Sequence, residues 1–183
     1  MAEVVLFHHL LGLTDGVLEF ADGLRAGGHT VHTPDLFGGE LPASLEEGSA
    51  LAERLAPELR ERDWSVYDGM VYAGISWGVM TAQRLAQTRP GARGALLYEA
   101  CLPVSGEWAI GPWPEGLPVQ VHGMDRDPFF AGEGDVDAAR ELPGELYLYD
   151  GDQHLFLDAS LPSYDGLATG LVLSRSRAFI DSL

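Results

Sequence analysis

Residues 71–80 read VYAGISWGVM, an apolar run that meets a helical pattern at the pentad Gly74-Ile75-Ser76-Trp77-Gly78. In a nucleophile elbow, a serine occupies a strained turn between a strand and a helix. The positions two residues to either side of that serine must be small, because neighbouring backbone approaches them closely. Gly74 and Gly78 meet that need. The pattern is short, so the flanking sequence has to decide whether Ser76 is a nucleophile or an ordinary turn serine.

The sequence on both sides of the pentad fits a strand followed by a helix. Residues 66–73 read as a buried strand, and residues 77–88 carry apolar side chains at helical spacing. Pro90-Gly91 then ends the helical pattern. The sequence therefore places Ser76 at a strand-to-helix turn.

Apolar strands alternate with amphipathic helices about six times along the chain. This alternation predicts a three-layer α/β fold, in which a mostly parallel sheet of about six strands is covered by helices on both faces. We expect one domain over residues 1–183, without a lid. The other predicted strands are 3–7, 29–34, 93–99, 119–123 and 145–149, and further helices are expected to begin near residues 15, 45, 135 and 167.

Two of these helices carry more specific expectations. Pro57 is expected to kink or restart the second helix, because proline lacks the amide hydrogen that a helix interior needs. The closing helix is expected to bury a stripe made of Leu167, Leu171, Val172, Phe179 and Leu183.

Composition excludes several classes of function. The chain holds 28 Asp and Glu against 11 Arg and no Lys, for a formal net charge of −17. This charge argues against nucleic-acid binding, and the lack of lysine excludes Schiff-base chemistry and a P-loop. The one cysteine, Cys101, reads as a small buried residue and suits a reducing compartment. No apolar run reaches the roughly 18 residues of a membrane span, so we expect a cytoplasmic protein without a membrane partner.

Three side chains that could take part in catalysis each follow a predicted strand: Ser76, Asp127 and His154. In open α/β sheets, ligands bind beyond the carboxyl ends of the strands. A serine becomes a nucleophile when an imidazole takes its proton, and a carboxylate orients that imidazole. The chain order Ser, Asp, His is the one described for α/β-hydrolases. Asp125 is the alternative acid, two residues before Asp127.

An acyl-transfer site also needs donors for the oxyanion of its tetrahedral intermediate. The backbone amide of Trp77 follows the nucleophile, and the amide of Leu10 lies in the loop after the first strand. No metal site is expected, because His8 and His9 are adjacent and no other histidine pair has ligand spacing. No cofactor is expected either.

Aromatic side chains are candidates for a substrate pocket, since small-molecule sites are mostly apolar. Trp108 and Trp113 lie in the proline-rich segment 101–118 and could line such a pocket or anchor that segment to the core. The same two interpretations apply to His9, Phe37, Phe129 and Phe156.

Over nearly its whole length, the chain resembles the dienelactone hydrolases, the carboxymethylenebutenolidase-like family of the α/β-hydrolase superfamily. The segments that carry the resemblance are VVLFHHLLGL, HTVHTPDLFGG, GISWG, VQVHGMDRDPFF, YDGDQHLFLD and SYDGLATGLVLSRSRAFI. The resemblance implies that Ser76 is the nucleophile, Asp127 the acid and His154 the base.

The chain departs from the family in three places. Ser76 stands where the best-known members carry cysteine, His9 aligns with a glutamate, and the region between Phe37 and Trp64 is shortened. The resemblance thus implies a serine hydrolase that acts on a small ester, lactone or thioester. The alternatives are an acyltransferase or peptidase with the same triad, and a catalytically silent binding or regulatory module. The sequence indicates no oligomeric state.

Overall fold

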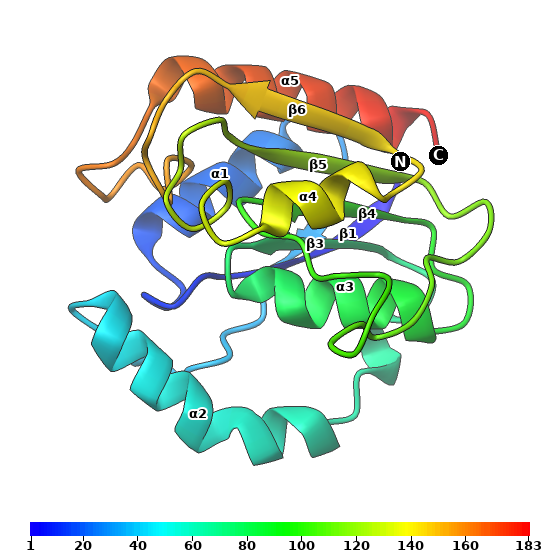
Figure 1. Cartoon of the computed structure of the whole chain (residues 1–183), viewed down its shortest axis with the longest axis horizontal. Coiled ribbons are helices and arrows are strands. Elements are labelled where there is room, and N and C mark those ends of the chain that lie inside the picture. The colour runs from blue at the N-terminus through cyan, green and yellow to red at the C-terminus, as the bar shows by residue number, and fades with distance from the viewer.

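A six-stranded sheet with the order β2-β1-β3-β4-β5-β6 forms the centre of the structure, a computed structural model that describes all 183 residues (Figure 1). All five strand pairings are parallel, a stricter arrangement than the mostly parallel sheet expected. The carboxyl ends of all the strands therefore lie along one edge. The strands are β1 Glu3–Phe7, β2 Thr30–His32, β3 Val71–Ile75, β4 Gly94–Tyr98, β5 Val119–Met124 and β6 Glu145–Tyr149.

Helices cover both faces of this sheet, which makes the three layers expected. The helices are α1 Asp15–Arg25, α2 Leu45–Glu61, α3 Gly78–Thr88, α4 Asp135–Arg140 and α5 Gly166–Asp181. Helices α1 and α5 pack on one face, and α2, α3 and α4 lie on the other (Figure 1). No helix is long and apolar enough to cross a membrane.

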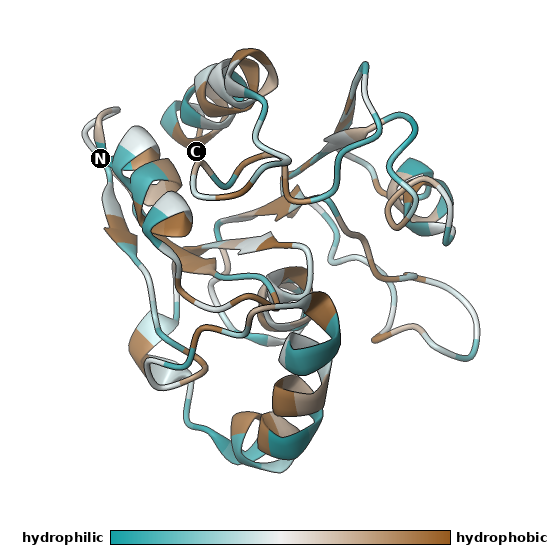
Figure 2. Ribbon diagram, turned by 90° about the vertical axis from the view of Figure 1, so that its left-hand side faces the viewer, coloured by the Kyte–Doolittle hydropathy of each residue, from teal (hydrophilic) through white to brown (hydrophobic).

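Each face of the sheet has its own apolar core. Along β3, Tyr72 belongs to the core beneath α2 and α3, whereas Val71, Ala73 and Ile75 belong to the core beneath α1 and α5. Successive strand side chains point to opposite faces, so the inner strands β3, β4 and β5 of this doubly covered sheet are buried at every position, whereas the edge strand β6 is partly exposed. Figure 2 shows the resulting hydrophobic interior strands and the mixed colouring of the covering helices.

The predicted strand 66–73 is shorter than expected at its start. Residues Ser65–Tyr67 form a 3₁₀ turn, and β3 begins only at Val71. Gly69 between them has φ 74°, a left-handed conformation that interrupts an extended chain. The apolar run that begins at residue 66 is therefore divided between the 3₁₀ turn and β3, and only the part that belongs to β3 pairs in the sheet.

Two expectations about helices were only partly met. Helix α2 is one helix from Leu45 to Glu61 with Pro57 inside it, so it does not restart at the proline, and it changes direction along its length (Figure 1). Leu51 and Leu59, on either side of the proline, both pack into the core. In α5, Val172 and Phe179 are buried as expected, but Leu167 and Leu171 are 87% and 51% exposed. The buried face is completed by Ala168, Thr169, Ser176 and Ile180, and Leu183 lies beyond the end of the helix, partly buried. The small Ala168 and Ser176 let the helix approach the sheet, where the hydroxyl of Tyr98 donates to Ser176 Oγ at 2.9 Å.

Candidate functional site

Ser76 sits at a strained turn between β3 and α3. Its φ of 51° lies in the left-handed region, which a residue with a side chain rarely adopts. A Cβ at position 74 would lie 2.5 Å from Gly78 C, and a Cβ at position 78 would lie 2.3 Å from Phe7 O. Both glycines are therefore required by close backbone approach, and the turn has the geometry expected of a nucleophile elbow.

The structure brings Ser76, His154 and Asp127 into one hydrogen-bonded line. His154 Nε2 is 2.8 Å from Ser76 Oγ, and His154 Nδ1 is 2.7 Å from Asp127 Oδ2. Because a carboxylate only accepts, Nδ1 carries the hydrogen and Nε2 is free to accept the serine proton. The three side chains come from the loops after β3, β6 and β5, which meet at the carboxyl edge of the sheet.

Asp127, and not Asp125, faces the imidazole. Asp127 is fully buried, and its Oδ1 accepts the backbone amides of Phe129 at 2.8 Å and Phe130 at 3.3 Å. These bonds leave Oδ2 directed at His154. Asp125 is partly exposed and instead pairs with Arg126 and accepts the Gly151 amide.

Several groups act on the protonation of His154. Burial lowers the pKa of the imidazole, but the hydrogen bond with Asp127 and the charges of Glu99, Asp127 and Asp135 raise it more, so the pKa lies above its ordinary value of 6.5. The side chain of His154 is only 10% exposed, and the ring of Phe129 packs against it with a centroid separation of 4.6 Å. The imidazole is therefore partly shielded from water.

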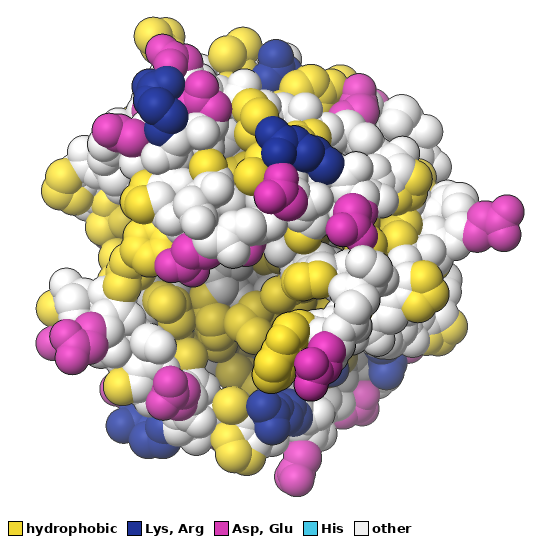
Figure 3. Space-filling model, viewed as in Figure 1, with side chains coloured by type: hydrophobic (Ala, Val, Ile, Leu, Met, Phe, Trp, Pro, Cys, Tyr) yellow, Lys and Arg dark blue, Asp and Glu magenta, His cyan; other side chains and the backbone are white.

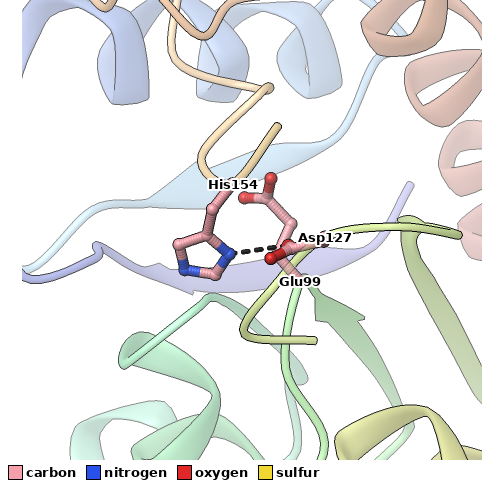
Figure 4. Close-up of side chains that lie close together, drawn as sticks. All are labelled: Glu99, Asp127 and His154. Atoms are coloured by element: carbon pink, nitrogen blue, oxygen red, sulfur yellow. Dashed lines mark hydrogen bonds and ion pairs between the residues drawn. The ribbon is translucent and has the colours of Figure 1, made fainter. Parts of the chain in front are cut away.

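Glu99 is a member of this cluster that the sequence did not single out. It directly follows β4, is 1% exposed and has a left-handed φ of 62°. Titratable atoms of Glu99, Asp127 and His154 all lie within 4.8 Å of one another. Figure 4 shows both carboxyl groups on the same side of the His154 ring. The sequence feature that could have identified Glu99 as a site residue is its position immediately after a buried apolar strand.

The same three residues could offer ligand atoms to a metal ion. However, His154 Nδ1 and Asp127 Oδ2 already bind each other at 2.7 Å. An ion held between them would have to replace that hydrogen bond. The arrangement is that of a carboxylate orienting an imidazole.

The candidate oxyanion donors come from two segments, the loop after β1 and the residue that follows Ser76. The amides of Leu10 and Trp77 both fall outside helices and strands, and neither donates to another group of the protein. Free, fixed amides of this kind are available to an anionic oxygen. A Cβ at Gly48 of α2 would lie 2.1 Å from Leu10 O, so α2 directly supports the Leu10 loop.

His8 and His9 hold this loop in place, and the His8 ring also packs against Phe37 with a centroid separation of 4.9 Å. Both are fully buried. His8 Nε2 accepts the Leu36 amide at 3.0 Å and Nδ1 donates to His9 O at 2.7 Å, while burial lowers the pKa of His8 to about 4. His9 Nδ1 accepts the Leu11 amide, and Nε2 donates to Asp158 at 2.8 Å. The structure therefore does not bring His9 into a pocket.

The aromatic candidates divide into three groups. Trp108 is 84% exposed and lines a groove of about 330 Å³ together with Trp77, Met80, Leu102 and Ile110. Figure 3 shows a hollow lined by hydrophobic side chains on this face. The groove runs between α2 and α3 and includes the residue next to Ser76.

Phe37 and Phe129 differ in exposure. Phe37 is a 3% exposed core residue that packs on Trp77 with a centroid separation of 5.1 Å, whereas Phe129 is 40% exposed beside His154. Phe156 is fully buried in the core under α1 and α5, and Trp113 packs against the other core with its indole N–H donating to Leu117 O. Those last two side chains are structural anchors.

Comparison with solved structures identifies the fold. A dienelactone hydrolase-like promiscuous phosphotriesterase from metagenomic libraries superimposes with a TM-score of 0.74 at 16% identity, over 100% of this chain and 87% of that one. The chain has the α/β-hydrolase fold.

Other solved structures with this fold carry different descriptions. The esterase domain of a Rhodothermus marinus protein matches with a TM-score of 0.59 at 14% identity, over 97% of this chain and 85% of that one. The RedJ thioesterase of Streptomyces coelicolor matches with a TM-score of 0.56 at 17% identity, over 93% and 85%. No family model and no curated protein matches the sequence.

Proposed function

We propose that this protein is a serine hydrolase that cleaves a small ester, lactone or thioester, and that it belongs with the dienelactone hydrolases. The observation that carries the proposal is the line from Ser76 Oγ through His154 to Asp127, with separations of 2.8 and 2.7 Å. The structures with the same fold include an esterase, a thioesterase and a dienelactone hydrolase-like enzyme, which supports the same class of reaction.

In the first half of the reaction, His154 Nε2 takes the proton of Ser76 as the serine oxygen attacks the carbonyl carbon. Asp127 stabilises the imidazolium that forms and keeps the hydrogen of the neutral ring on Nδ1. His154 then donates its proton to the leaving alcohol or thiol, so that an acyl-serine remains. In the second half, His154 deprotonates a water molecule whose oxygen attacks the acyl carbon. The bond from that carbon to Ser76 Oγ then breaks, His154 returns the proton to Oγ, and the acid is released.

The tetrahedral intermediates place a negative charge on the former carbonyl oxygen. The amides of Leu10 and Trp77 are the proposed donors, and loss of one such donor typically lowers kcat about 10²–10³-fold. Both are backbone groups, so the positions of the loop after β1 and of the α3 start decide the strength of this stabilisation.

The groove beside Trp77 is the proposed binding site for the apolar part of the substrate. Its volume of about 330 Å³ and its lining by Met80, Leu102, Trp108 and Ile110 suit a short hydrocarbon chain. The proposed nearer walls are Phe37, which packs on Trp77, and Phe129, which packs on His154.

The test combines labelling and turnover. A fluorophosphonate probe followed by peptide mass spectrometry should modify Ser76 alone, and p-nitrophenyl acetate should be hydrolysed by the wild type. Ser76→Ala should abolish both signals while leaving the thermal midpoint nearly unchanged. A wild-type protein that is neither labelled nor active would be a silent module with this fold, and turnover retained by Ser76→Ala would place the nucleophile elsewhere.

A further inference from the structure

Glu99 is a buried carboxyl group whose hydrogen bonds are incomplete. Its Oε1 accepts the backbone amide of Phe156 at 2.8 Å, whereas its Oε2 is buried without a partner. Buried carboxyl oxygens are normally satisfied, because an unpaired buried polar atom costs free energy. An exception of this kind, beside the proposed general base, calls for a functional reason.

The backbone around Glu99 is strained in a matched way on two loops. Glu99 has φ 62°, and Leu155, which separates His154 from Phe156, has φ 60°. Side-chain residues in the left-handed region persist only where surrounding contacts hold them. The hydrogen bond from the Phe156 amide to Glu99 is such a contact, and it joins the end of β4 to the turn that carries His154.

Glu99 also differs from Asp127 in what surrounds it. Asp127 receives two backbone amides on one oxygen and the imidazole on the other. Glu99 has no cation beside it other than a protonated His154, because the remaining titratable groups around the ring, Asp127 and Asp135, are acidic. Its charge can therefore be compensated only when His154 holds a proton.

We propose that Glu99 is a positioning residue for His154, which fixes the turn that carries the imidazole and, once ionised, supplies a second negative charge when the imidazole takes the serine proton. This role rests on the proposed function. Burial, partly opposed by a charged His154, raises the pKa of Glu99 to about 8, so the carboxyl group is largely neutral at pH 7 and becomes charged as the pH rises through 8. Glu99 and His154 then titrate as a coupled pair.

Glu99→Gln tests the charge separately from the shape. Glutamine keeps an oxygen that can accept the Phe156 amide, but it cannot ionise. At pH 9, where Glu99 is charged, we expect kcat for p-nitrophenyl acetate to fall about tenfold, with KM within about threefold of wild type. The kcat of the wild type should rise further as Glu99 ionises near pH 8, and this rise should be absent in Glu99→Gln. Asp125→Asn, which neutralises an exposed carboxylate nearby, should leave both unchanged.

A second measurement does not depend on turnover. The ring titration of His154 can be followed by NMR, with its signal identified by loss in His154→Ala. In the wild type the ring titration should carry a second component near pH 8, from the ionisation of Glu99, and Glu99→Gln should lack it. Unchanged kcat at pH 9, an unchanged pH profile near pH 8 and an unchanged ring titration in a folded Glu99→Gln would overturn the proposal and leave Glu99 a purely structural residue. If the wild type has no activity, the proposed function fails, and the NMR titration alone decides whether Glu99 acts on His154.

Discussion

The Nε2 atom of His154 lies 2.8 Å from the Oγ atom of Ser76, although 78 residues separate them in the chain. A proton can pass between these atoms only when the imidazole is neutral. Since the net effect of the surrounding groups raises the pKa of His154 above 6.5, the base is lost on acidification at a higher pH than for a free histidine. We expect kcat/KM for a short ester to rise with pH along an acid limb centred above pH 6.5. A limb centred below pH 6 would contradict this assignment.

The two neighbouring aspartates should differ sharply when each is made neutral. Asp127→Asn keeps the size of the side chain but no longer holds the hydrogen on His154 Nδ1, so kcat should fall about 10³–10⁴-fold. Asp125→Asn should change kcat less than twofold, because Asp125 is bound to Arg126 and the Gly151 amide and does not contact His154. Steady-state kinetics of both variants on one substrate makes the comparison. A large loss in Asp125→Asn alone would reverse the choice of acid.

Gly48→Ala should impair catalysis without touching the reacting groups. The new methyl group would lie 2.1 Å from Leu10 O, a contact with backbone that forces the Leu10 loop to shift. Displacement of one oxyanion donor should lower kcat by up to about 10²-fold, with a smaller effect on KM. Gly170→Ala is the matched control, because that helical glycine has open space around it and alanine favours a helix. Equal kcat in both variants would argue against the Leu10 amide as a donor.

The pH dependence of stability gives an independent measure of Glu99. Its folded pKa of about 8 lies above the ordinary value of 4.5, because burial disfavours the charged form. The stability it contributes is complete below pH 4.5 and is lost as the pH rises toward 8. Glu99→Gln removes this titration. The difference between the thermal midpoint of the variant and that of the wild type should therefore shift in favour of the variant as the pH rises from 5 to 8. Thermal melts across this range check it, and a difference independent of pH would contradict the raised pKa.

Trp108→Ala should affect substrate binding more than stability. The side chain is 84% exposed, so its removal should change the free energy of unfolding by no more than about 0.5 kcal/mol. Because Trp108 lines the groove beside Trp77, KM for a p-nitrophenyl hexanoate should rise severalfold while that for the acetate stays constant. Leu167→Ala, which removes an 87% exposed side chain from α5, is the control. An equal change in KM for both esters would mean that the acyl chain of the hexanoate binds outside this groove.

Local sequence patterns predicted the structure correctly where a single stretch of sequence determines it. The strand-turn-helix around Ser76 was predicted from two glycines and the apolar runs that flank them, and the structure has it. The buried face of α5 was predicted wrongly at Leu167 and Leu171, because helical spacing permits more than one apolar stripe. Which stripe is buried depends on the sheet surface it meets.

The sequence by itself determined the alternation of strands and helices, the elbow, and the set of loops that would share one edge of the sheet. These follow from periodicity and from the rule that the carboxyl ends of parallel strands lie together. Only the tertiary structure decided that Asp127 rather than Asp125 faces His154, that His9 turns inward to Asp158, and that Glu99 joins the cluster. Those outcomes depend on side-chain direction within loops and on contacts between residues far apart in the chain, which no local pattern encodes.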